Sequence, residues 1–269
     1  MNMDNFIIDR VKRGVMFSNV TGEARWALNQ LENFNLKVTT DKQEVVDALG
    51  TPVQEFYRGK KGEATGQASF LNLTLLAEQS GSEKIVAAAG TKMDTPVWEE
   101  FIVTKEQETS GLTLRETPMG LEGSEIGFIY VMSNDGTIQT KYQQGATANT
   151  TDFQVTGKTV KLPTPVKEGA RVWVPYTAAV QSGVGLDNNA DKFPKAGRFV
   201  LEVLGHDVCD AETVYYAYVV CPNAKLASDI DLTLAAGEKH PFTLSLLQDY
   251  CSANKQLFYV RIPDVAPQG

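Results

Sequence analysis

The sequence predicts a mainly β protein, built as a β-sandwich or barrel-like sheet with one short flanking helix. Short runs rich in β-branched and aromatic residues recur along the chain, and turn-forming segments such as residues 134–137 and 167–170 separate them. A single stretch, residues 70–78, has the apolar spacing of an amphipathic helix. Many strands with one helix are typical of a sandwich or a barrel.

The N-terminal part has a defined order of elements. After a lead-in with a short helix expected around residues 23–31, it reads as a strand at 36–40, a loop at 41–52, strands at 53–57 and 63–68, and the helix at 70–78. Lys60 and Lys61 between the last two strands are expected at a hairpin tip. Ser69 is placed to cap the helix and Gly81 to end it. A helix this short is marginal alone in water, so we expect it to lie against a sheet.

The rest of the chain reads as strands joined by turns. We expect strands at 127–133, 154–155, 158–162, 171–177, 199–204, 214–220, 230–235 and 257–261. Residues 143–151 are small and polar, which favours a flexible loop or linker.

The loop expected at residues 41–52 is unusual in length and composition. It exceeds the two to five residues common in hairpins, and it carries Val45, Val46 and Leu49, which a solvated loop does not need. Either these side chains fold back onto the core of their own chain, or they pack on another copy. We favour the second reading and predict subunit contacts at Val45, Val46, Leu49 and Pro52.

Composition excludes some functions. The 269 residues carry a net charge of −8, and an acidic balance argues against binding of nucleic acid or anionic membranes through a basic surface. The N-terminus lacks the apolar core of a secretory signal, and no apolar run is long enough to span a membrane. We therefore expect assembly in a reducing cytoplasm, with Cys209, Cys221 and Cys251 as buried free thiols.

No residues combine into a catalytic or metal-binding pattern. His206 and His240, the only histidines, have polar neighbours and are expected in surface turns. The acidic segment from Asp187 lacks the glycine and glutamate of a calcium loop, because Lys192 and Arg198 stand at those positions. We expect no enzyme activity, no cofactor and no metal.

Residues 191–247 carry a resemblance to a known family. The segment contains D-K-F-P before a strand, then a strand ending in P-N-A-K-L, then T-L-A-A-G and a further strand. This order resembles the phage major tail-tube proteins, and the strand, loop, strand and helix order of residues 35–81 is similar to their N-terminal half. The resemblance covers about half of the chain. It implies a tube domain formed by residues 1–119 and 186–269, with residues 120–185 as an immunoglobulin-like insertion or as further tube strands.

The resemblance also implies a function. Tail-tube proteins form hexameric rings that stack into a hollow tube, which conducts DNA during ejection. The partners would be other copies of the chain and other tail proteins, with DNA passing through, in the tail of the virion. Three alternatives stay open: a capsid decoration or tail-terminator protein, a related secretion-system tube, and a monomeric β-sandwich module that binds, for example, carbohydrate.

Overall fold

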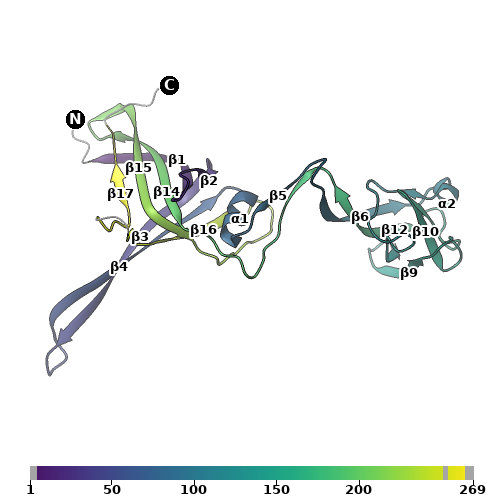
Figure 1. Ribbon diagram of the computed structural model, residues 1–269, viewed down its shortest axis with the longest axis horizontal. Helices are drawn as coiled ribbons and strands as arrows, with labels where there is room; N and C mark the ends of the chain where they lie inside the picture. The colour runs from purple at the N-terminus through teal and green to yellow at the C-terminus, as the bar shows by residue number, and fades with distance from the viewer. Residues whose placement is uncertain (1–4, 251–253, 264–269) are drawn as a thin grey trace. The chain divides into compact units, whose positions relative to one another are not determined.

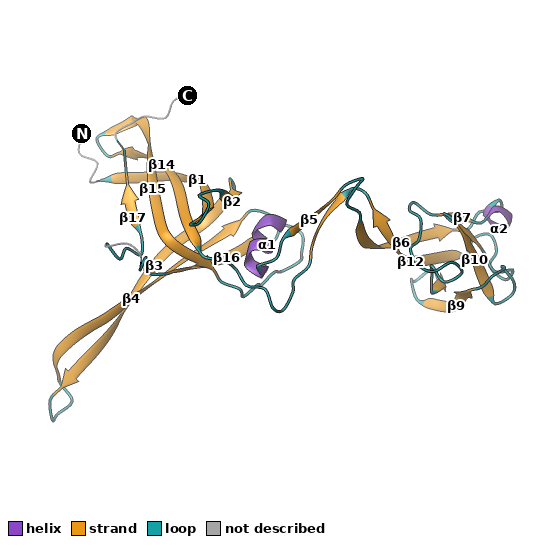
Figure 2. Cartoon of the chain, in the orientation of Figure 1, coloured by secondary structure: helices purple, strands orange, loops and turns teal. Residues whose placement is uncertain are grey.

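The computed structural model describes residues 5–250 and 254–263 and is mainly β, as predicted (Figures 1 and 2). Its contacts divide the chain into two compact units. Unit 1 comprises Met1–Lys84 and Leu186–Gly269, and unit 2 comprises Ile85–Gly185. The inserted segment therefore starts at residue 85, whereas the sequence placed its start at 120. The reason is strand β6 (Met93–Ile102), which pairs along its whole length with β12 (Arg171–Val180) of the same unit.

Unit 1 is built on one eight-stranded sheet. The order along it is β2-β1-β14-β15-β16-β4-β3, and β17 pairs with β15 outside that path. The strands are β1 (Phe6–Ser18), β2 (Ala24–Leu28), β3 (Leu31–Val46), β4 (Pro52–Ala68), β14 (Gly197–Asp207), β15 (Asp210–Leu226), β16 (His240–Leu246) and β17 (Tyr259–Arg261). All pairs in this sheet are antiparallel.

The core of unit 1 lies on one face of this sheet. Alternation along β14 sends Phe199, Leu201 and Val203 to that face, where Trp26 packs on the Phe199 ring at 5.7 Å between centroids. Phe242 from β16 approaches the same Trp26 edge-on at 6.0 Å. These aromatic contacts join β2, β14 and β16, which are far apart in sequence, in one core.

Helix α1 (Leu73–Ser80) closes one side of the core. Asn72, rather than the expected Ser69, is its N-cap, because the Asn72 Oδ1 accepts from the backbone N–H groups of Thr74 and Leu75 at 3.0 Å. Leu75 is fully buried against the core. Gly81 ends the helix in the left-handed conformation at φ 69°, as predicted.

Other local predictions for unit 1 are also wrong. Residues 23–31 contain strand β2 instead of a helix, because Trp26 and Leu28 bury at a period of two against β1. Lys60 and Lys61 lie inside the continuous strand β4, which β3 pairs across that region, rather than at a hairpin tip. Residues 230–235 form no strand.

Unit 2 is a second, mainly β body. Its seven-stranded sheet has the order β6-β12-β8-β9-β10-β11-β7. The strands not yet located are β7 (Leu112–Thr113), β8 (Phe128–Met132), β9 (Ile138–Gln144), β10 (Asp152–Thr156) and β11 (Thr159–Lys161), and the short helix α2 spans Gln107–Ser110. Phe153, Ile129, Val172 and Val174 are fully buried in a core separate from that of unit 1.

Residues 143–151 connect strands inside unit 2 and are not a linker between domains. Gln143 and Gln144 pair with β10, and the Asn149 side chain accepts from the backbone N–H groups of Thr151 and Asp152. The chain enters and leaves unit 2 through β5 (Lys84–Ala87) and β13 (Gly183–Leu186), which pair with each other. Neither α1 nor α2, the helices in the described residues, is long and apolar enough to cross a bilayer.

Candidate assembly interface

Strands β3 and β4 continue as a two-stranded ribbon after their neighbour in the sheet has ended. Strand β16 pairs with β4 only from Ala68 to Gly62, whereas the β3–β4 ladder runs on to the pair Val46 and Pro52. We call residues 39–61 the arm; in the described part of the chain its two strands pair only with each other (Figure 1). A lone two-stranded hairpin is marginally stable in water, so the arm has the geometry of a segment that other contacts complete.

The four predicted contact residues meet at the far end of the arm. Val45 and Val46 end β3, Leu49 lies in the turn, and Pro52 begins β4. Their segment is a hairpin end, not the long loop expected from the sequence, because the strands extend through most of residues 41–52. Val45, Val46 and Leu49 are 45%, 52% and 91% exposed. They do not fold back onto the core of their own chain.

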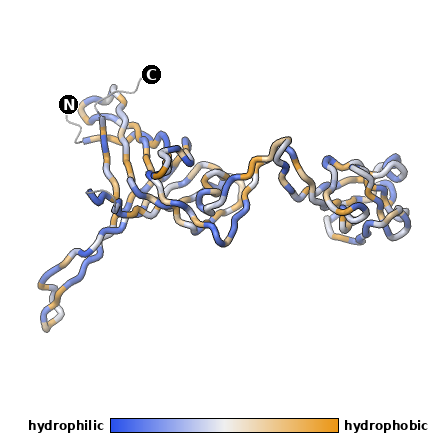
Figure 3. The backbone as a smooth tube through the Cα atoms, in the orientation of Figure 1, coloured by the Kyte–Doolittle hydropathy of each residue, from blue (hydrophilic) through white to orange (hydrophobic). Residues whose placement is uncertain are grey.

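The arm carries further exposed apolar side chains that the sequence did not indicate as contact residues. Val53, Phe56 and Tyr57 on β4 are all exposed. Phe56 lies opposite Gln43 in the ladder and Tyr57 opposite Lys42. Figure 3 shows apolar stretches within this otherwise polar ribbon. The pattern in 53–57 predicts a strand correctly, but it does not show that both faces of that strand are free.

The turn at the end of the arm is fixed by one side chain. Asp47 Oδ1 accepts from the backbone N–H groups of Leu49 at 2.8 Å and Thr51 at 2.9 Å. Gly50 adopts φ 83°, a conformation that favours glycine, and its N–H donates to the Asp47 carbonyl. The turn therefore presents Leu49 in a defined position.

A lysine offsets the repulsion between two facing carboxylates in the arm. Glu44 and Glu55 lie opposite each other in the ladder, where like charges are unfavourable. Lys42 Nζ lies 2.8 Å from a Glu44 oxygen and 3.2 Å from a Glu55 oxygen. The hydrogen bond to Glu44, followed by that to Glu55, raises the pKa of Lys42, and the Lys42 ammonium lowers the pKa of Glu55. These side chains are exposed, so the ion pairs add little to the stability of the arm.

The sheet of unit 1 has open edges. Strands β2 and β3 stand at the two ends of the order, so among the described residues the outer side of β3 has no ladder partner along its length. A long strand edge offers backbone N–H and C=O groups to another chain. The open edge is continuous with the arm because both belong to β3.

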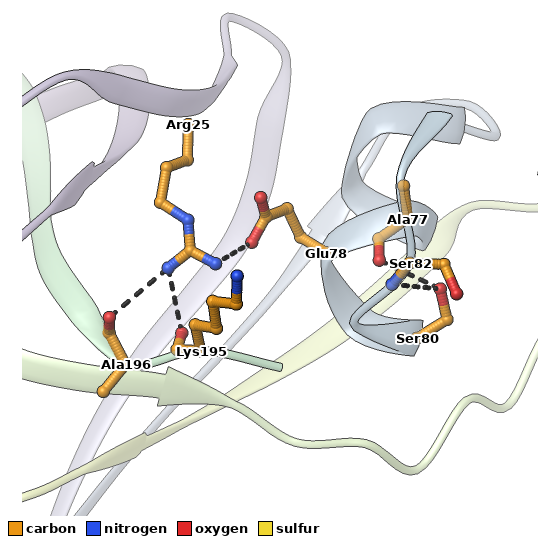
Figure 4. A network of polar contacts seen from close by, with 7 residues as sticks. All are labelled: Arg25, Ala77, Glu78, Ser80, Ser82, Lys195 and Ala196. Atoms are coloured by element: carbon orange, nitrogen blue, oxygen red, sulfur yellow. Dashed lines mark hydrogen bonds and ion pairs between the residues drawn. The ribbon is translucent and has the colours of Figure 1, made fainter. Parts of the chain in front are cut away.

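Arg25 links three elements of unit 1 (Figure 4). Its guanidinium donates to the Glu78 carboxylate of α1 at 2.5 Å and to the carbonyl oxygens of Lys195 and Ala196 at 3.1 and 3.3 Å. The Arg25 and Glu78 side chains are 17% and 21% exposed. One side chain therefore ties β2, α1 and the segment leading into β14.

The histidines and cysteines do not form a chemical site. His240, expected in a surface turn, is 1% exposed; its Nε2 lies 2.7 Å from Gln79 Oε1, and its Nδ1 accepts from the Asn72 N–H at 3.3 Å. Cys221 is buried, which raises its pKa to about 12, whereas Cys209 is exposed against expectation. Cys251 lies outside the described residues. Across 5–250 and 254–263, no group of three or more His, Cys, Asp or Glu could hold a metal ion.

The family comparison matches nearly the whole chain. The model of the YomU/Tube protein family matches residues 6–260. The chain belongs to this family. The family consists of phage-associated structural tube proteins and is not an enzyme family. This agrees with the resemblance to tail-tube proteins. The chain is therefore a tube component of a phage tail. No curated protein matches the tube protein.

Proposed function

We propose that this tube protein forms rings, with six subunits each, that stack into the tail tube and enclose the channel through which phage DNA is ejected. Membership of the family shows that the chain is a tube protein. Ring symmetry, stacking and DNA passage are the parts that this proposal adds.

The observation that carries the proposal is the arm. An exposed ribbon with Val45, Val46, Leu49, Val53 and Phe56 on its surface is poorly suited to stand alone in water. Packing on a neighbouring subunit buries these side chains and gives the ribbon the support that its own sheet does not provide. The arm thus acts as the contact between subunits, within a ring or between rings.

The open sheet edges support ring closure. In a closed ring the outer side of β3 pairs with the sheet of the next subunit, and the repetition of this pairing leaves no exposed edge. Closed symmetry of this kind also limits the size of the ring.

The charge of the chain suits the passage of DNA. A net charge of −8 disfavours adhesion of a polyanion to the tube wall, since like charges repel over about 8 Å at physiological ionic strength. DNA then crosses the channel without being held.

The test places charges at the tip of the arm. We expect the double variant Val46→Asp, Leu49→Asp to remain folded, because both side chains are exposed, and to lose the ability to form tubes, because the contact would bury two carboxylates. Negative-stain electron microscopy of concentrated, aged protein detects tubes or stacked rings, and far-ultraviolet circular dichroism reports folding.

A matched control separates the arm from a general effect of charge. Val20 and Leu121 are 95% and 82% exposed and lie outside the arm, so Val20→Asp, Leu121→Asp should assemble like the unchanged protein. Normal tubes from the arm variant would refute the contact role of the tip. Loss of its dichroism signal would instead mean that the tip supports the fold of its own chain.

A further inference from the structure

Unit 2 carries a line of aromatic rings on the face of its sheet opposite the core. The line runs Trp98, Trp173, Tyr130, Phe128, from β6 across β12 to β8. Successive ring centroids lie 6.1, 5.2 and 6.5 Å apart. The rings are therefore in contact with one another and form a continuous aromatic row.

The aromatic row is open to solvent. Trp98 is 67% exposed and Phe128 41%, and Trp173 and Tyr130 are partly exposed. Alternation along β12 sends the neighbours of Trp173, which are Val172 and Val174, into the core. The core of unit 2 is thus complete without the row, and packing of unit 2 gives no reason for four aromatic residues there.

Polar groups that can form hydrogen bonds lie beside Trp173, Tyr130 and Phe128. Glu100 lies opposite Trp173 in the β6–β12 ladder and holds the Arg171 guanidinium at 2.6 and 3.1 Å. Lys141 lies opposite Tyr130 in the β8–β9 ladder, and its Nζ lies 4.9 Å from the centroid of the Phe128 ring. Gln143 lies opposite Phe128. Flat apolar surfaces therefore alternate with donors and acceptors across the face.

This alternation selects a class of ligand. A sugar ring has a face of C–H groups, which an aromatic face attracts, and a rim of hydroxyl groups, which bond to carboxylate, amide, guanidinium and ammonium groups. A nucleic acid would need a basic surface, but acidic residues outnumber basic ones in unit 2, and Glu100 offsets Arg171. The centre of a protein interface is depleted of charge, whereas Glu100, Arg171 and Lys141 stand beside these rings.

We propose that the aromatic row of unit 2 binds neutral polysaccharide, with sugar rings stacked on Trp98, Trp173 and Tyr130. The binding needs neither rings nor tubes, so it stands independently of the proposed tube function. A single chain would bind weakly, and many copies in an assembly would bind by avidity.

The experiment measures retention of the full chain in native gels that contain a soluble neutral polymer. Hydroxyethyl cellulose, glucomannan and glycol chitin are the neutral probes, and alginate and single-stranded DNA are the charged ones. Tryptophan emission gives a second readout. Trp26 is 3% exposed in unit 1, so a shift in emission on addition of polymer reports Trp98 and Trp173.

The decisive variant is Trp98→Ala. Trp98 is largely exposed, so its removal leaves the fold intact, as circular dichroism can verify. We expect it to weaken retention about tenfold or more, the loss typical of an aromatic residue that carries much of the binding energy. Tyr250→Ala removes an aromatic residue that is 84% exposed in unit 1, and this control should bind like the unchanged protein.

Several outcomes would overturn the proposal. They are retention by none of the neutral polymers, equal retention of Trp98→Ala, and binding only to the charged polymers with loss at high salt. A change in the mass of the particles in solution caused by Trp98→Ala, without any polysaccharide binding, would assign the row to contacts between copies of the chain instead.

Discussion

Single residues fix the local geometry of unit 1, and Gly81 is the clearest case. It ends α1 at φ 69°, and a Cβ on it would lie 2.3 Å from the carbonyl carbon and oxygen of Phe193. The D-K-F-P segment thus passes directly over the end of the helix. The sequence predicts Gly81 as a helix terminator, but the approach of Phe193, which is more than a hundred positions away, leaves no local signal.

We expect Gly81→Ala to destabilise unit 1 by more than about 2 kcal/mol, since the clash with backbone adds to the cost of about 1–2 kcal/mol for a left-handed alanine. Gly22→Ala is the control. Gly22 has φ 76° with no atom within 4 Å of the added Cβ, so only the conformational cost applies. Urea unfolding of both variants measures the difference, and equal losses would show that the Phe193 contact is unimportant.

His240 makes the stability of unit 1 depend on pH. Burial lowers the pKa of His240 below its ordinary value of about 6.5, because a charged imidazole is unfavourable away from water. The unfolded chain therefore binds the proton more readily. The contribution of neutral His240 is fully present above pH 6.5 and is lost as pH falls through the lower folded pKa.

We expect the urea midpoint of the unchanged protein to be lower at pH 5.5 than at pH 7.5. His240→Gln should be less stable at pH 7.5, since it alters the contact to Gln79, but should show a smaller change between the two pH values. The carboxylates with lowered pKa, such as Glu32 and Glu125, titrate below this range. An unchanged pH dependence in the variant would exclude His240 as its source.

At the scale of elements, the sequence predicts types better than lengths. The alternation of residues in β12 is clear because one face of the strand is buried. The arm shows no such alternation, because both of its faces are exposed. Residues 41–52 therefore read as a loop, although most of them belong to the paired strands β3 and β4. Trp26 and Leu28 show the opposite error, since tertiary burial overrides a local pattern that suggests a helix.

The arm is expected to be the least protected part of the unit 1 sheet before assembly. Backbone amides of residues 42–57 should exchange with deuterium much faster than those of β14, which has a strand on each side. In assembled tubes the arm should become protected while β14 changes little. Slow exchange of the arm in the unassembled protein would contradict its description as an unsupported ribbon.

For the whole molecule, two separate cores predict two unfolding events. The apolar clusters of units 1 and 2 share no residue, and each unit has its own sheet. Calorimetry should therefore show two transitions. A variant in which a short turn replaces residues 88–182, so that β5 and β13 close as a hairpin, should keep only one. A single transition in the unchanged chain would show that the units unfold as one.

The division of the molecule could be predicted only in part. The middle of the sequence departs from the tail-tube pattern and indicates an insertion from residue 120, which leaves residues 85–119 in the tube domain. Only the long-range pairing of β6 with β12 assigns them to unit 2. The aromatic row could not be predicted either, because Trp98, Trp173 and Tyr130 are far apart in sequence. Only the strand pairing of β6 with β12 and of β12 with β8 brings them together.

The pairing of β5 with β13 has an evolutionary consequence. Strands β5 and β13 lie side by side where the chain passes from unit 1 into unit 2 and back. Unit 2 therefore occupies the place of a loop between two neighbouring strands. Recombination at these two boundaries, which are neighbours in the structure, can lengthen, exchange or remove the whole of unit 2. The strands of unit 1 keep their pairing partners. Unit 2 can thus change or be lost while the sheet of unit 1 stays the same.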